Sequence, residues 1–127
     1  MPHNVHHEHL IKELTSMLSP IFKNSPQAVY LYLDDEHKTC NEKFAKLLGY
    51  SNIQAWVKNL YPVSDVDEPD QEKVIKGYMN ASRKLLASSL NVTLVRKDGK
   101  KVKADLFMSP ISYEGEVFVL HFLSPKK

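Results

Sequence analysis

The chain has 127 residues, 43% of them hydrophobic and 25% charged, which fits one globular domain of ordinary composition. Its formal net charge of +2 excludes the strongly basic surface typical of nucleic-acid-binding proteins and excludes a polybasic membrane anchor. Because Cys40 is the one cysteine and no apolar run reaches the roughly 18 residues of a membrane span, the sequence excludes an intramolecular disulfide and a transmembrane helix, and we expect a cytoplasmic protein.

Residues 1–25 predict an N-terminal extension that carries an amphipathic helix over about residues 5–22. Apolar side chains recur there with helical period, and the opposite face is polar. The apolar stripe is wider than the edge of one sheet would cover, so we predict a homodimer through this helix. The contact residues that we expect in the dimer are Leu10, Leu14, Met17 and Leu18.

Four histidines stand at the start of this extension, at His3, His6, His7 and His9. Their spacing is compatible with weak metal binding, but a flexible run of this kind is more often solvated. We therefore predict no metal site.

Residues 26–125 predict the main domain, which begins with two strands. Residues 28–33 alternate tyrosine with aliphatic residues, a pattern typical of a strand that is apolar on both faces. An acidic turn then leads into a second, short strand that ends at Thr39 and Cys40.

The stretch from Asn41 to Ser51 predicts a short helix with a capping residue at its start and a glycine that ends it. Asn41 can cap its start through the side-chain oxygen, and an apolar stripe with helical spacing follows. Gly49 supplies the left-handed residue that ends such a helix. Ser51 and Gln54 form a capping box, so we expect a second short helix directly afterwards.

The second half of the chain predicts one long helix and three strands. The helix, at about residues 69–87, has a broad apolar stripe that must lie half buried against a sheet. A hairpin at Asp98-Gly99 joins the first two strands, and Pro110 is expected to end the regular pairing of the second. The strands cover about residues 90–94, 102–108 and 117–123.

This order of features, with N-x-x-F-x-x-L-x-G-Y-S at residues 41–51, resembles the PAS domain family of sensor modules. The resemblance covers about residues 26–124. It implies an α+β fold with a five-stranded antiparallel sheet in the order 2-1-5-4-3, and with short helices and one long helix on one face. The N-terminal amphipathic helix would then lie over the opposite face of the last strand.

We expect a ligand cavity between the sheet and the helices. Alternation along residues 101–108 sends Lys101, Lys103 and Asp105 to water, so the residues between them point inward. The predicted lining residues are Leu94, Leu106, Met108, Val119 and His121 on the sheet, with Val74 and Tyr78 on the long helix.

His121 has two interpretations. It is either a core histidine, hydrogen-bonded to a backbone carbonyl or to buried water, or the polar residue that reads a ligand. The second interpretation follows from the resemblance, because flavin-binding members of the family use the matching position in this way. Since histidine can change charge near neutral pH, His121 is also our candidate for a ligand- or pH-linked switch.

The sequence leaves any cofactor unidentified and disfavours two that the family uses. Photoactive flavin-binding members carry a cysteine in a G-x-N-C-R-F-L-Q motif, and Leu60 stands at that position here. Haem-binding members commonly supply an axial histidine from the long helix, and residues 69–87 contain none.

No nucleophile-elbow, P-loop or zinc-protease motif is present, so we predict no enzymatic activity. The resemblance implies a non-catalytic signal-transduction module that binds a small molecule or a protein partner and signals to a partner in trans. One alternative is a ligand-free dimerisation or docking module. Another, from a different class, is a small cone-shaped α+β enzyme, which would need an inward acid–base pair where the sequence offers only His121.

Overall fold

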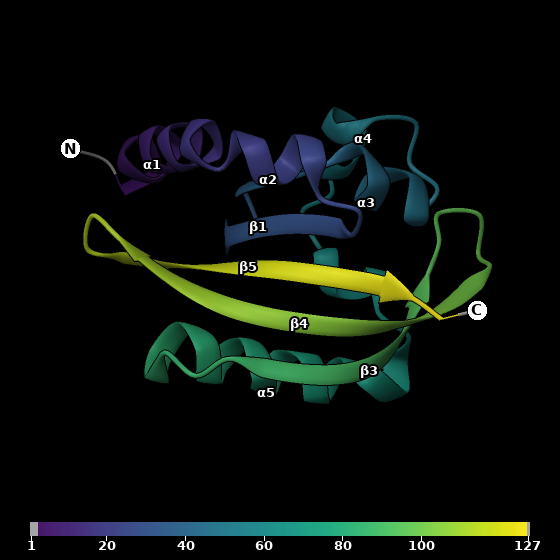
Figure 1. Ribbon diagram of the computed structural model, residues 1–127. Helices are drawn as coiled ribbons and strands as arrows, with labels where there is room; N and C mark the ends of the chain where they lie inside the picture. The colour runs from purple at the N-terminus through teal and green to yellow at the C-terminus, as the bar shows by residue number, and fades with distance from the viewer. Residues whose placement is uncertain (1–2, 127) are drawn as a thin grey trace.

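Five strands form one antiparallel sheet in the order β2-β1-β5-β4-β3 (Figure 1). The computed structural model describes residues 3–126, with side chains described from His6 onward, so the side chain of His3 lies outside the described part. The strands are β1 (Ala28–Asp34), β2 (His37–Cys40), β3 (Ser88–Val95), β4 (Lys101–Tyr113) and β5 (Glu116–Pro125). The α+β fold and the strand order predicted from the sequence are confirmed.

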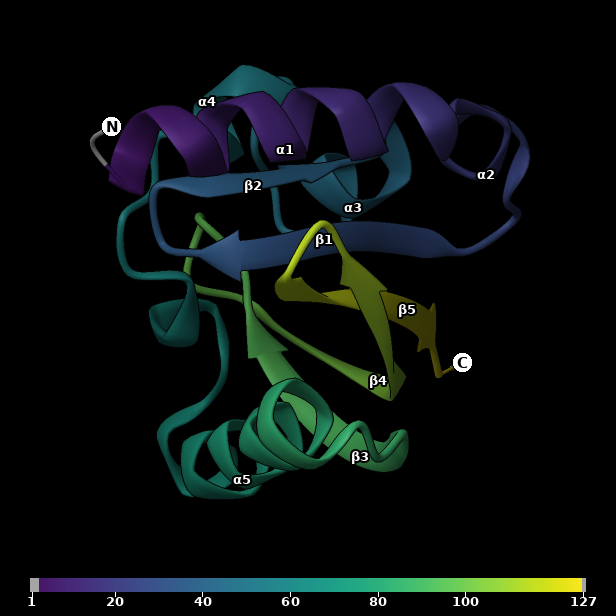
Figure 2. The ribbon, with the colours of Figure 1, turned by 90° about the vertical axis from the view of Figure 1, so that its left-hand side faces the viewer.

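Helices lie on both faces of the sheet (Figure 2). The inner face is covered by α3 (Glu42–Leu47), α4 (Ile53–Val57), the 3-10 helix η1 (Pro62–Asp65) and the long α5 (Glu68–Lys84). The outer face is covered in part by α1 (His3–Met17), which leads into α2 (Ser19–Asn24). Among the helices within residues 3–126, none combines the length and apolar character that crossing a membrane requires.

Strand parity determines which residues of β4 reach the inner core. Leu106 and Met108 are buried, whereas Lys103, Asp105 and Phe107 are exposed. Successive side chains of a strand point to opposite faces, so this alternation places the apolar set of β4 against α5. The predicted wet face of this strand is confirmed for Lys103 and Asp105.

α1 packs on the outer face of β1 and β5, where Leu10 and Leu14 are only 2% and 3% exposed. Phe118 of β5 belongs to the same buried cluster. The premise of the dimer prediction, a stripe left uncovered by the sheet, is therefore wrong for Leu10 and Leu14, because the chain's own sheet covers them. Of the same set, Leu18 is partly buried and Met17 is 62% exposed.

The N-terminal extension holds two helices where the sequence predicted one over residues 5–22. α1 ends at Met17, and α2 begins at Ser19 after a single linking residue. Pro20 is the reason for the break, since it has no N–H to donate within a continuing helix but fits the first turn of a new one.

Asn41 caps α3 as predicted and also joins the helix to the sheet. Its Oδ1 accepts hydrogen bonds from the backbone N–H of Phe44 at 3.0 Å and of Val29 at 3.1 Å. Gly49 follows the helix with a φ of 81°, in the left-handed region that favours glycine. The cap and the stop that the sequence predicted are both confirmed.

The cap of α4 is Asn52, one residue later than the predicted Ser51. Asn52 Oδ1 accepts a hydrogen bond from the backbone N–H of Ala55 at 2.9 Å. The capping-box prediction was wrong because asparagine is as good a cap as serine, and the two stand side by side in the sequence.

Two further boundaries differ from the predicted ones. α5 ends at Lys84, because Leu85 adopts a left-handed φ of 56°, so the helix does not reach residue 87. Pro110 continues β4 opposite Val119 and does not end its pairing. β3 pairs with β4 only as far as Met108, so Pro110 needs no N–H on that side.

Candidate functional site

A cavity of about 110 Å³ lies between the inner face of the sheet and the segment formed by η1 and α5. Residues of β1, β5, η1 and α5 form most of its wall. The lining residues are Tyr30, Tyr32, Asp35, Pro62, Val63, Val66, Val74, Ile75, Tyr78 and His121. Apolar and aromatic surface with a few polar groups is the usual composition of a small-molecule pocket.

Tyr30 and His121 form one wall of the cavity as a stacked pair. They are register partners on β1 and β5, so their side chains share a face of the sheet. Their ring centroids lie 3.8 Å apart with an interplanar angle of 11°. Behind Tyr30, the rings of Phe44 and Trp56 lie 4.6 Å and 5.4 Å away. The cavity therefore has an aromatic wall that is backed by further aromatic rings.

His121 is held as a neutral imidazole. The residue is 3% exposed, and its Nδ1 lies 3.1 Å from the carbonyl oxygen of Val119, which can only accept a hydrogen bond. Burial lowers the pKa of His121 to about 3. The expectation that His121 changes charge near neutral pH is therefore wrong, because a proton on the ring would have to enter an apolar interior.

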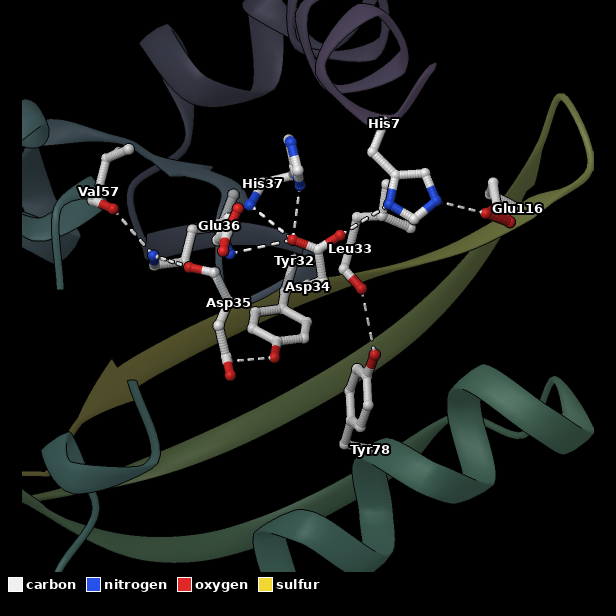
Figure 3. A network of polar contacts seen from close by, with 11 residues as sticks. His7, Tyr32, Leu33, Asp34, Asp35, Glu36, His37, Val57, Tyr78 and Glu116 are labelled. Carbon is white, nitrogen blue, oxygen red and sulfur yellow. Dashed lines mark hydrogen bonds and ion pairs between the residues drawn. The ribbon is translucent and has the colours of Figure 1, made fainter. Parts of the chain in front are cut away.

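Two further tyrosines, Tyr32 and Tyr78, line the cavity, and Figure 3 shows the acceptors of their hydroxyl groups. Tyr32 donates to Asp35 Oδ1 at 2.5 Å, and Tyr78 donates to the carbonyl oxygen of Leu33 at 3.4 Å. Burial raises the pKa of both phenols, and the Asp35 carboxylate raises that of Tyr32 further, so both hydroxyls keep their protons at neutral pH. The rings meet edge to face at 5.1 Å.

The structure brings three of the seven predicted cavity residues to the wall: His121, Val74 and Tyr78. The other four, Leu94, Leu106, Met108 and Val119, are buried in the same core but do not line the cavity. The position of Met108 explains this difference. Its Cε packs so closely on Gly77 of α5 that a Cβ added to this glycine would lie only 2.4 Å away. The close approach of α5 to β4 thus fills the space that these residues were expected to border.

A buried carboxylate beside the cavity was not predicted. Asp65 is 8% exposed, and burial raises its pKa. It accepts hydrogen bonds from Trp56 Nε1 at 3.0 Å, from the Tyr50 hydroxyl at 3.2 Å and from Asn59 Nδ2 at 3.3 Å. In the sequence it stands in an acidic loop that looks solvated, and only the nearby Trp56 and Asn59 could have suggested partners.

Neither the cysteine of the chain nor the position matched to the flavin-reactive cysteine lies in the lining of the cavity. Cys40 is buried on β2, outside the lining of the cavity, and burial raises the pKa of its thiol to about 12. Leu60, at the position of the flavin-reactive cysteine, is 48% exposed in the loop after α4. The cavity of about 110 Å³ also falls below the roughly 300–1,000 Å³ of most ligand pockets.

Comparison with known proteins supports the fold and the family. A family model described as PAS domain matches residues 26–123. The PAS domain of an HTR-like protein from Haloarcula marismortui is 20% identical with a TM-score of 0.60, over 95% of this chain and 98% of that chain. A PAS domain from Colwellia psychrerythraea is 20% identical with a TM-score of 0.64, over 89% of this chain and 97% of that chain.

The Rhodobacter sphaeroides LOV protein is a more distant relative in sequence, at 17% identity, with a TM-score of 0.67 over 90% of this chain and 67% of that chain. At such identities the likeness shows the fold alone. A comparison with curated proteins finds no sequence match. Because the family model spans most of the sheet and the helices of its inner face, the chain belongs to the PAS domain family.

Proposed function

We propose that this PAS domain is a non-catalytic sensor that binds a small, uncharged aromatic molecule in the cavity beside His121. The observation that carries the proposal is the stacked pair of Tyr30 and His121 in the wall of a cavity of about 110 Å³. An apolar cavity of about 150 Å³ holds benzene in another protein, so one aromatic ring matches the space. A flavin or a haem would require the cavity to open far wider.

The polar groups that line the cavity are His121, Tyr32, Tyr78 and the Asp35 carboxylate, which already accepts a hydrogen bond from the Tyr32 hydroxyl. With Asp35 engaged in this way, the wall favours a neutral ligand. His121 carries no charge at neutral pH, and the hydroxyls of Tyr32 and Tyr78 already have acceptors. A hydroxyl oxygen can still accept a hydrogen bond while it donates one. A ligand with a single donor, such as a phenol or an indole, would therefore find acceptors in the hydroxyl oxygens of Tyr32 and Tyr78.

The cavity wall also offers a route by which a signal would reach a partner in trans. η1 and the start of α5 border the cavity, and Val66, between them, forms an isolated bridge with Leu94 of β3. A ligand that fills the cavity would press on this segment and shift it relative to the sheet. The exposed surface of α5, with Ile75 and Met79 each just over 40% exposed, would change position with it.

Nuclear magnetic resonance titration of the full chain with phenol and with indole tests the proposal. We expect shifts centred on Tyr30, Tyr78 and His121. The Val74→Phe variant should lose them, because the larger side chain fills the cavity, whereas Met79→Phe on the exposed side of α5 should keep them. If Val74→Phe unfolds, Val63→Phe at the mouth serves instead. Shifts that are absent in the wild type, or unchanged in the filled variants, would disprove the proposal.

As a second candidate we propose a homodimer that forms through the outer face. Two large apolar side chains favour it: Met17 of α1 is 62% exposed, and Phe107 of β4 is 42% exposed. Sedimentation velocity should show a dimer that Phe107→Lys converts to monomer and that Leu86→Lys, on the loop after α5, leaves intact. A wild type that stays monomeric at high concentration would exclude this candidate. Leu14→Lys is unsuitable, because it would bury a charge beneath α1.

A further inference from the structure

Two imidazoles and two carboxylates meet at one end of the sheet (Figure 3). His7 comes from α1, Asp34 from the end of β1, His37 from the start of β2 and Glu116 from the start of β5. Asp34 Oδ2 lies 2.7 Å from His7 Nδ1, and Asp34 Oδ1 lies 2.7 Å from His37 Nδ1. Glu116 Oε1 lies 2.6 Å from His7 Nε2. Residues up to 109 positions apart in the chain thus converge on one small cluster.

The charge of this cluster suits a cation. In the metal-free cluster each ring nitrogen of His7 faces a carboxylate, so both nitrogens carry hydrogens and the ring is cationic. Once an ion has displaced the ligand hydrogens, two carboxylates and two neutral imidazoles would face it with a formal charge of −2. The side chains of His7 and His37 are each 10% exposed, while Asp34 is 38% and Glu116 24% exposed. The imidazoles are therefore shielded and the carboxylates remain reachable from solvent, so an ion could enter without unfolding the chain.

From this geometry we infer a binding site for a divalent transition-metal ion such as Zn²⁺, with His7 Nδ1, His37 Nδ1 and the Asp34 carboxylate as its ligands. These ligand atoms all lie within 4.8 Å of one another. A tetrahedral zinc ion holds neighbouring ligand atoms roughly 3.3 Å apart, so small side-chain rotations would complete the site. Imidazole ligands favour zinc and its neighbours over calcium or magnesium, which prefer oxygen.

The surroundings hold the ligands in the orientation that metal binding needs. Glu116 accepts from the second ring nitrogen of His7, and a carboxylate in this position commonly orients a metal-bound histidine. Asp34 Oδ1 accepts from the backbone N–H groups of Glu36 at 3.0 Å and of His37 at 2.8 Å. Carboxylates only accept, so both Nδ1 atoms carry hydrogens in these contacts, and the ion would take the place of those hydrogens and release them.

Metal binding at this site would fasten the N-terminal helix to the sheet. His7 belongs to α1, whereas Asp34 ends β1 and His37 begins β2, on either side of the turn between them. The cluster is separate from the cavity, which has neither His7, Asp34 nor His37 in its wall. An ion could therefore bind here whether or not the cavity holds a ligand.

Isothermal titration of the chelator-treated full chain with Zn²⁺, followed by Co²⁺ absorption spectroscopy, tests this inference. We expect one Zn²⁺ per chain, a higher unfolding temperature with Zn²⁺, and visible d–d bands of a low-symmetry site with Co²⁺. His37→Gln should abolish all three signals. Glu116→Gln should weaken Zn²⁺ binding by roughly 10–100-fold, since it replaces the orienting carboxylate with a neutral, weaker acceptor and removes no ligand.

Two variants control for folding and for the other histidines. Asp34→Asn keeps an oxygen for the N–H groups of the turn but loses the anionic ligand, so a folded Asp34→Asn chain that no longer binds Zn²⁺ supports the site. His9→Gln removes an exposed histidine of the same helix, paired with Glu13 at 3.1 Å, and should bind Zn²⁺ like the wild type. Wild-type affinity in both His37→Gln and Asp34→Asn, or loss of binding in His9→Gln, would overturn the inference.

Discussion

Lowering the pH should destabilise the folded chain through His121. In the unfolded chain the imidazole has a pKa near 6.5, whereas burial lowers its pKa to about 3 in the folded chain. Between these two values the unfolded chain binds one proton more than the folded chain, so the free energy of unfolding falls as the pH falls. From about pH 7.5 to about pH 5, this one group accounts for a loss of about 2 kcal/mol.

Urea denaturation of the wild type and of His121→Leu at these two pH values isolates the effect. The variant lacks the stack on Tyr30 at both pH values, so the stability lost with that contact is the same at each pH. It therefore cancels when the change in the free energy of unfolding between the two pH values is taken for each protein. The contributions of the rest of the chain are the same in both proteins and cancel in the same way. We expect the wild type to lose about 2 kcal/mol more than the variant between the two pH values.

Equal losses in the two proteins would refute the reasoning. They would mean that His121 can take up a proton without leaving the fold, for example by reaching water through the cavity. A change in the slope of the urea transition has to be checked as well, because it would indicate an altered unfolded state and not a protonation effect.

Two further predictions concern stability. In urea denaturation, Gly49→Val should lower the free energy of unfolding more than Gly99→Val does. Both glycines have a φ above 80°, a conformation that costs a β-branched residue about 1–2 kcal/mol. Only at Gly49 would the new Cβ also contact a side chain, at 3.3 Å from Arg96 Nη2. Equal costs would show that Arg96 moves aside freely. Asp65→Ala should cost about 2 kcal/mol or more, because three hydrogen-bond donors lose their acceptor, while the exposed Asp105→Ala should change stability by less than about 0.5 kcal/mol. A similar effect of both aspartate changes would mean that water replaces Asp65.

The features that local chemistry determines could be predicted from the sequence. Asn41 caps a helix because its own side chain reaches the first turn, and Gly49 ends that helix because glycine tolerates a positive φ. The alternation along β4 follows from the period of a strand. Each of these depends on residues within a few positions of one another. The strand order, which is not a local feature, was predicted from the family resemblance.

The features that depend on distant partners could not be predicted. The sequence shows that α1 has an apolar stripe, but not that β1 and β5 of the same chain cover Leu10 and Leu14. Asp65 looks like one more acid in a solvated loop until the fold brings Tyr50, Trp56 and Asn59 around it. Burial of a charged group is a property of its neighbours, which a local pattern does not contain.

His121 has one property that the local sequence predicts, its orientation, and one that it does not, its charge state. Strand parity correctly placed it on the inner face, because Val119 and His121 are two positions apart on β5. Its charge state depends instead on its burial in the folded chain, where the antiparallel register of β1 and β5 stacks the Tyr30 ring directly on it. A histidine with the same neighbours in sequence but with a small polar residue opposite it would keep water at its ring and titrate near neutral pH. The surroundings that the fold gives His121, and not the histidine itself, therefore keep this position of the cavity wall uncharged at neutral pH.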